Sequence, residues 1–326
     1  MAADIDGGTV RQITVKLALV LLWMFVIPFI TFGHGGEVHA RSLWTLWEFD
    51  PLIIGVLLVS GSIYGLGLRN LWRSAGIGHG IRNGEAIYYG LGWLSLIVAL
   101  VSPVHLLGEL LFSMHMTQHE LLMLVSAPLI VLGRPFVAAA WAVPGKSRKR
   151  AGDAVRSPMV DRTWNFLSNG AVAWVIHAVA LWVWHVPAMF QATLRSDLVH
   201  TLQHASFFGT ALLFWWAVLF GKRGLQSYGA GVLYLFTTMV QSGLLGIFLT
   251  LTSHVWYPVY SATTGLFGLS PLEDQQIGGL IMWIPAGLIY MFAALVMFSG
   301  WLRESEKRVI AREESTKAQI TAAQQI

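Results

Sequence analysis

Two pairs of histidines in this chain of 326 residues have a spacing that suits metal binding. His115 and His119 are four residues apart, and so are His200 and His204. On an α-helix, side chains four residues apart share one face with Cβ atoms about 6 Å apart, so one ion can take a nitrogen from each imidazole. Each pair is therefore a candidate half of a metal site.

The available ligand types favour copper. The chain has no cysteine, which excludes thiolate metal sites, disulfides and covalent c-type haem attachment. Neutral imidazole suits copper, zinc or iron, and thioether sulfur specifically favours Cu(I). Met114 and Met116 flank His115, so we expect a copper site with Met116 as an auxiliary ligand.

Two further side chains are candidates for the same site. His185 is an expected auxiliary or transfer ligand, and His177 lies about 12 Å deeper on the same helix face, as a relay station or an interhelical hydrogen-bonding group. Asp274 could supply a carboxylate, although an Asp at this position is also typical of a helix cap. Glu120 is either an orienting group beside His119 or a packing residue.

Other interpretations of the histidines remain open. One imidazole from each of two helices could bind haem b on opposite faces, as in an electron-transfer protein. The same rings could instead only pack between helices, in a metal-free scaffold. No phosphate-binding loop or recognisable hydrolase arrangement is present, so neither an ATP-driven pump nor a hydrolase is supported, and we expect no enzyme.

The composition shows which elements must carry these residues. Hydrophobic residues make up 55% of the chain and charged residues only 12%, whereas soluble proteins have about 25% charged residues. We predict an all-α membrane protein, a polytopic transmembrane helix bundle of seven to eight spans. The expected spans are 11–32, 50–70, 84–103, 110–133, 164–186, 200–220, 229–252 and 277–300.

The basic residues predict the orientation of these spans. All but two of the 21 Lys and Arg residues fall on one side, and the exceptions are Arg41 and Arg195. The basic side of a membrane protein faces the cytoplasm, so we predict a multi-pass protein of the bacterial inner membrane with a cytoplasmic C-terminus. The basic residues lie in short loops beside apolar runs, so they indicate topology and contact with membrane lipid, not nucleic-acid binding.

The first 40 residues allow two interpretations. A basic start, a long apolar stretch and the ending Val38-His39-Ala40 fit either a retained span or a cleaved secretory signal. We therefore divide the chain into an N-terminal span or signal-like segment, 1–40, a transmembrane bundle, 41–302, and a charged cytoplasmic tail, 303–326.

The predicted topology gathers the histidines on one side. Only His79 of the 11 histidines is expected in the cytoplasm. Ten are expected outside or in the outer half of the membrane: His34, His39, His105, His115, His119, His177, His185, His200, His204 and His254. Ionisable residues within the membrane are costly, so this asymmetry indicates a function at the outer face.

Several motifs, in order, resemble the integral-membrane CtaG family of cytochrome c oxidase assembly factors, those linked to caa-type oxidases. The motifs span roughly residues 50 to 300. They are His115-Met116-Thr117-Gln118-His119, Ala127-Pro128-Leu129, Leu132-Gly133-Arg134-Pro135, Trp182-Val183-Trp184-His185-Val186-Pro187, His200-Thr201-Leu202-Gln203-His204 with Trp215-Trp216, Asp274-Gln275-Gln276, Gly278-Gly279 and Met282-Trp283-Ile284-Pro285.

The resemblance implies a role in the maturation of a haem-copper oxidase. Together with the His and Met pattern, it predicts a protein that binds copper at the outer face and delivers it to cytochrome c oxidase subunits. A periplasmic copper donor is a possible second partner. A copper permease is a weaker alternative, because no polar path of His or Met continues into the inner half of the membrane.

Overall fold

The computed structural model describes residues 47–144, 147, 157–221 and 226–323. Within these residues the regular structure is entirely helical. The long elements are α3 (Pro51–Ala75), α4 (Asn83–Leu100), α11 (Gly170–His185), α13 (Asp197–Phe220), α14 (Gln226–Leu251) and α15 (Pro271–Ala323). The shorter ones are α5 (Pro103–Leu110), α6 (Phe112–Glu120), η1 (Leu121–Ser126), α7 (Ala127–Leu132), α8 (Pro135–Ala142), α10 (Pro158–Leu167), α12 (Pro187–Thr193), η2 (Pro258–Ala262) and η3 (Thr264–Phe267).

The membrane-spanning elements are partly long helices and partly bent pairs. Four helices are individually long and apolar enough to cross a membrane, and the count reaches seven if each bent pair forms one span. The pairs α4–α5, α6/α7–α8 and α10–α11 bend by 42°, 56° and 64°. The expected first span, 11–32, lies outside the described residues. A multi-pass helical membrane protein is thus confirmed, with four to seven spans in the described part of the chain.

Prolines and caps explain where the bends fall. Pro103, Pro135 and Pro158 each occupy the first position of a short helix, where a missing N–H costs nothing. The side chain of Asn169 accepts a hydrogen bond from the Ala171 N–H at 3.1 Å and starts α11. The expected span 164–186 is therefore divided, and only its part from Gly170 onward belongs to the straight helix.

The helix that carries His115 and His119 lies in the middle of the bundle. All nine residues of α6 are buried, although its sequence is polar. It continues through the π-helical segment η1 into α7, where Pro128 has no N–H to donate to the preceding turn. On one side α6 contacts α15, where a Cβ added to Gly278 would lie 3.3 Å from the Met116 side chain.

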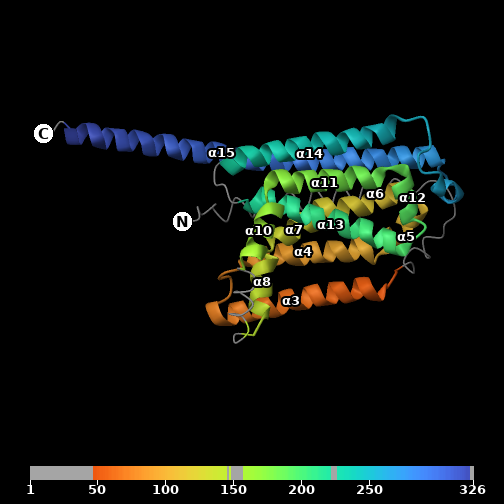
Figure 1. Ribbon diagram of the computed structural model, residues 1–326, viewed down its shortest axis with the longest axis horizontal. Helices are drawn as coiled ribbons and strands as arrows, with labels where there is room; N and C mark the ends of the chain where they lie inside the picture. The colour runs from red at the N-terminus through yellow and green to blue at the C-terminus, as the bar shows by residue number, and fades with distance from the viewer. Residues whose placement is uncertain (1–46, 145–146, 148–156, 222–225, 324–326) are drawn as a thin grey trace.

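The two ends of the bundle differ. Figure 1 shows α5 and α12 at one end, and the long C-terminal part of α15 extending beyond the opposite end. The expected tail, 303–326, is the continuation of the last helix as far as Ala323. The α5 and α12 end corresponds to the face predicted to be extracytoplasmic.

Candidate metal centre

The N-terminus of α6 is fixed by a carboxylate from another helix. Oδ2 of Asp274, in α15, accepts a hydrogen bond from the Phe112 N–H at 2.6 Å, and Oδ1 accepts from the Ser113 N–H at 3.1 Å and the Ser113 hydroxyl at 2.5 Å. A carboxylate here satisfies free N–H groups and interacts favourably with the helix dipole. Asp274 therefore caps α6, not its own helix, and holds the helix of His115 and His119 in place.

Close packing brings α5 against the same helix. A Cβ added to Gly108 would lie 3.2 Å from the His115 Cα and 3.3 Å from Oε1 of Gln118, so a side chain at this position would need one of the two to move. The hydroxyl of Tyr260 donates to the carbonyl of Gly108 at 3.0 Å. Gly108 thus permits α5, with His105, to lie directly beside the histidines of α6.

The two histidine pairs face each other in the interior of the bundle. Ring centroids are 4.4 Å apart for His115 and His119, and 4.3 Å apart for His200 and His204. Across the helices, His115 is 5.2 Å from His200, and His119 is 5.3 Å from His204. The structure therefore gathers four imidazoles from α6 and α13 into one cluster.

Several ring nitrogens of this cluster have no hydrogen-bond partner among the described residues. Both nitrogens of His119 are buried and unpaired, as are Nε2 of His185, His200 and His204. Leaving a buried polar atom unpaired costs about 1–3 kcal/mol, and such atoms are rare in folded proteins. Unpaired ring nitrogens gathered in one place are what a metal-binding site presents before it takes its ion.

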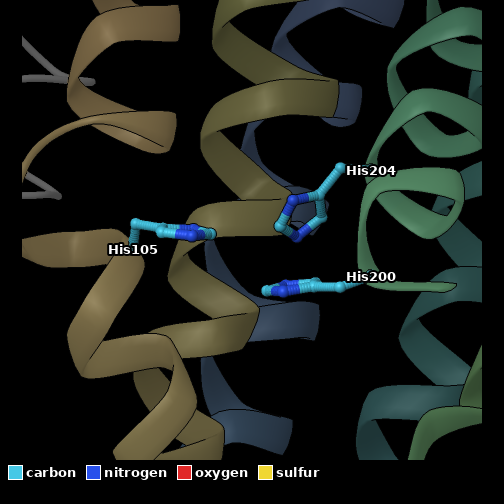
Figure 2. A group of neighbouring side chains, drawn as sticks. All are labelled: His105, His200 and His204. Atoms are coloured by element: carbon cyan, nitrogen blue, oxygen red, sulfur yellow. The ribbon is translucent and has the colours of Figure 1, made fainter. Parts of the chain in front are cut away.

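The geometry defines two overlapping sets of three histidines. His105, His200 and His204 form one set, and His115, His119 and His204 form the other; within each set the ligand nitrogens lie within 4.8 Å of one another. Figure 2 shows the first set, with the rings of His105 and His200 nearly parallel and His204 beside them. A tetrahedral ion with 2.1 Å bonds holds its ligands about 3.4 Å apart, so modest rotations would close either set around a metal.

The predicted spans 84–103 and 110–133 leave His105 in the connection between them, and His105 was not among the candidate ligands. Ser102 and Pro103 start a short helix there, and the ring becomes buried beside α13. A second missed feature is a glutamine in each histidine pair, in the shared pattern His-x-x-Gln-His. Nε2 of Gln118 lies 2.8 Å from Nδ1 of His105, and Oε1 of Gln203 lies 3.1 Å from Nε2 of His115.

Each of these glutamines holds a histidine of a neighbouring helix. In both, the other amide atom is buried and has no hydrogen-bond partner within the described ranges: Oε1 in Gln118 and Nε2 in Gln203. A half-turn of the Gln203 amide would offer the opposite hydrogen-bonding group to the same imidazole. In Gln118 a half-turn would also break the hydrogen bond that Nε2 donates to the Ala99 carbonyl oxygen at 2.8 Å. Gln203 can thus orient His115 in either tautomer, whereas the Ala99 contact favours the tautomer of His105 that accepts at Nδ1. The repeated Gln is the signal in the sequence that could have identified both residues.

The remaining predicted residues lie around the cluster. His185 faces it, with its ring 6.1 Å from that of His119 and its Nδ1 2.7 Å from the Leu181 carbonyl oxygen. Met116 is fully buried in the apolar core on the α15 side of α6. Both carboxylate oxygens of Asp274 are engaged by α6, and Asp274 is not part of either histidine set.

His177 and Glu120, the two remaining candidates from the sequence, are both buried. Nδ1 of His177 lies 3.0 Å from the Thr210 hydroxyl, and its ring stacks on Phe214, so it forms the interhelical hydrogen bond that was one of its two expected roles. Glu120 is buried beside His119 with Oε2 unpaired among the described residues. The Glu120 carboxyl group is not a member of either histidine set.

A cavity of about 760 Å³ opens beside the cluster. Most of its lining is apolar and comes from α3, α4 and α13, while His105, His200 and His204 line it together with Glu48 and Glu109. Glu48, His105 and Glu109 form a third group whose ligand atoms lie within 4.8 Å of one another, and both carboxylates are exposed. The histidine cluster therefore connects to an acidic mouth.

Comparisons with known proteins identify relatives of this chain. An uncharacterized protein of Mycobacterium bovis, Mb0105, is 29% identical over 284 residues, which cover 84% of this chain and 42% of the relative. The uncharacterized protein ML1998 of Mycobacterium leprae is 27% identical over 283 residues, covering 83% of this chain and 41% of the relative. The chain thus spans about two fifths of the length of these relatives. No solved structure matches it.

The family comparison covers the whole region of the site. Residues 62–304 match the family described as cytochrome c oxidase caa3 assembly factor (Caa3_CtaG), and this stretch includes α5, α6, α13 and Asp274. The match extends over more than half of the chain and agrees with the resemblance seen in the sequence motifs. The chain therefore belongs to the cytochrome c oxidase caa3 assembly factor family.

Proposed function

We propose that this protein binds copper in the histidine cluster and delivers it to cytochrome c oxidase subunits during assembly. The observation that carries the proposal is His119, whose two ring nitrogens are buried beside His115 and His204 and have no hydrogen-bond partner in the described part of the chain. A buried imidazole with no partner is unfavourable, and coordination of a metal ion would remove that cost. Copper is the substrate that the protein carries, and no chemical turnover is involved.

The position of the cluster supports handover at the outer face. The histidines come from α5, α6 and α13, near the end of the bundle opposite to the α15 extension. With the basic loops and the tail in the cytoplasm, this end faces the outside of the bacterial inner membrane. Sites of imidazole without thiolate bind copper exchangeably, which suits release to an oxidase subunit and loading from a periplasmic donor.

The test is metal analysis of the full chain purified in detergent and loaded with copper, followed by treatment with an external chelator. We expect wild-type protein to retain copper and the His115→Ala/His119→Ala variant to lose it. Thr237→Ala is a matched control, because this hydroxyl lies on α14 and bonds only backbone carbonyls of its own helix. Equal copper retention in wild type and the double histidine variant would contradict the proposal.

Haem b is the second candidate ligand, and an optical spectrum separates it from copper. A haem b bound as the sequence suggested would take one axial histidine on each face of its flat macrocycle. The rings of His115 and His119 lie 4.9 and 4.6 Å from those of Phe190 and Phe207, which leaves no space for a macrocycle between them. The cavity beside His200 and His204 is the place with room for one, so a Soret band lost in His200→Ala would favour the haem protein.

A metal-free scaffold is the third candidate. It predicts that oxidase activity in cells survives the His115→Ala and His200→Ala substitutions, because packing alone would be needed. Loss of oxidase activity at normal levels of the variant protein, together with loss of copper in the purified protein, would exclude this role.

A further inference from the structure

The three groups of candidate ligands overlap, and the overlap follows an order. Glu48, His105 and Glu109 form the outermost group; His105, His200 and His204 form the next; His115, His119 and His204 form the innermost. His105 belongs to the first two groups and His204 to the last two. Neighbouring groups therefore share one imidazole each.

We propose that these groups form an uptake route along which a metal cation moves inward by ligand exchange. This inference rests on the proposed copper-binding function and adds the path and the selection of the ion. In the first step the cation would leave Glu48 and Glu109 for His200 and His204 while it stays bound to His105. In the second step it would leave His105 and His200 for His115 and His119 while it stays bound to His204.

Retaining one ligand at each step has a physical advantage. A cation that lost all its ligands within the bundle would bear the full cost of an unsolvated charge, which amounts to several kcal/mol or more. With a shared imidazole, the ion always keeps at least one strong bond while the others exchange. His200 and His204 belong to the second group, and Nε2 of each is buried with no hydrogen-bond partner among the described residues, so both can accept the ion.

The acidic mouth supplies the charge that a cation needs at the start. The side chain of Glu48 is 49% exposed and lies 3.6 Å from Nε2 of His105, which is buried. Asp50 and Asp197 line the same cavity as Glu48 and Glu109. Four carboxylates around one opening raise the local concentration of cations and can speed their arrival by 10- to 1000-fold, as charged clefts do.

The change of ligand type along the route selects the ion. Carboxylate oxygens at the mouth accept magnesium and calcium as well as transition metals, whereas the two inner groups offer imidazole only. Hard cations would stop at the mouth, and copper or zinc would advance. The rest of the cavity wall is mostly apolar, and its hydroxyl groups are those of Ser60, Tyr89 and Thr201.

His105 must change its hydrogen bonding for the first step. Its Nδ1 accepts from Nε2 of Gln118, which also donates to the Ala99 carbonyl oxygen, so the ring proton is on Nε2, towards Glu48. Binding a metal through Nε2 requires the proton on Nδ1 instead. A half-turn of the Gln118 amide would bring Oε1 to Nδ1 to accept that proton, and it would break the hydrogen bond that Nε2 donates to the Ala99 carbonyl oxygen at 2.8 Å. Gln118 is therefore a positioning residue of the route.

The experiment measures uptake rate and final content separately. Full-length protein in detergent is stripped with a chelator, mixed rapidly with Cu(II) chloride and quenched at intervals with excess chelator; the retained copper gives the rate. For Glu48→Gln/Glu109→Gln we expect a rate at least about tenfold below wild type at low salt, with the same final content. Excess Mg²⁺ should slow wild-type uptake and leave the final content unchanged.

The control is Glu273→Gln, an exposed carboxylate in the first turn of α15 that forms a capping box with Ser270. Glutamine preserves such a box, so this variant removes one surface charge without disturbing the fold. It should take up copper at the wild-type rate.

The possible failures are distinguishable. If Glu48→Gln/Glu109→Gln takes up copper at the wild-type rate, the route is wrong and the copper site is unaffected. The same conclusion follows if Glu273→Gln slows uptake as much as the double variant does. Absence of retained copper in wild-type protein would overturn both the route and the proposed function.

Discussion

His119 and His177 are both buried histidines of the same helical bundle, yet their surroundings differ. His177 stacks on Phe214 and has the Thr210 hydroxyl 3.0 Å from Nδ1. His119 has no hydrogen-bond partner among the described residues and lies among three other imidazoles, those of His115, His185 and His204. Burial alone therefore does not mark a ligand; the number of unsatisfied nitrogens and the chemistry of the neighbours do.

The largest expected effect comes from replacing each of these two histidines. His119→Ala should lose the copper that resists an external chelator, because the innermost group keeps only two imidazoles. His177→Ala should retain it, since Thr210 already satisfies that ring. Metal analysis after chelator treatment checks both variants. Loss of copper in His177→Ala, with retention in His119→Ala, would show that His177 and not His119 is the ligand.

Replacing a glutamine that orients the cluster should have the next largest effect. Gln203→Leu removes the group 3.1 Å from Nε2 of His115, and groups that orient metal ligands typically contribute 10- to 100-fold in affinity. Gln241→Leu is the matched control, because Gln241 lies on α14 and accepts from Trp182 away from the cluster. Competitive titration with a copper chelator measures both affinities, and equal values would remove Gln203 from the site.

Asp274→Asn should separate a structural carboxylate from a ligand. The substitution weakens charge-assisted hydrogen bonds to Phe112 and Ser113, so the free energy of unfolding should fall by about 2 kcal/mol. Because Asp274 is outside the histidine groups, the retained copper should not change. Thermal unfolding in detergent and metal analysis test the two halves, and a loss of copper without loss of stability would make Asp274 a ligand.

The smallest expected effect comes from giving His177 an unsatisfied nitrogen. Thr210→Val keeps the shape of the side chain and removes the hydroxyl that bonds this ring. The loss of one buried hydrogen bond should lower the free energy of unfolding by about 1 kcal/mol. Copper content should stay at the wild-type value, because His177 belongs to none of the three groups of candidate ligands. Extra bound copper in Thr210→Val would show that a single buried histidine without a hydrogen-bond partner is sufficient to bind copper.

The sequence predicted the spans better than their shape. Apolar length alone places α3, α13 and α14 within a few residues of their bounds, because a span must be helical and long. The bends escaped prediction, since a proline or an Asn cap looks the same in a loop and at the start of a second helix. For that reason most of α5, which carries His105, fell between the predicted spans 84–103 and 110–133.

The site was only partly visible in the sequence. The spacing of His115 with His119 and of His200 with His204 predicted two half-sites, but helical periodicity could not show that they face each other. The contact of Asp274 with α6 joins residues 162 positions apart, and no local pattern encodes it. The repeated Gln in both His-x-x-Gln-His stretches was the one readable sign of a shared environment.

The π-helical segment η1 shifts the register of the helix that carries His115 and His119. A π-turn contains one residue more than an α-turn, so the residues beyond it are rotated by about 100° compared with an unbroken α-helix. Deleting Leu122 would force a choice: either the histidines keep facing α13, or Ile130 keeps its close packing against Gly92 on α4. The extra residue of the π-turn thus lets one span direct its histidines towards α13 and pack Ile130 against α4, which a regular helix could not do at the same time.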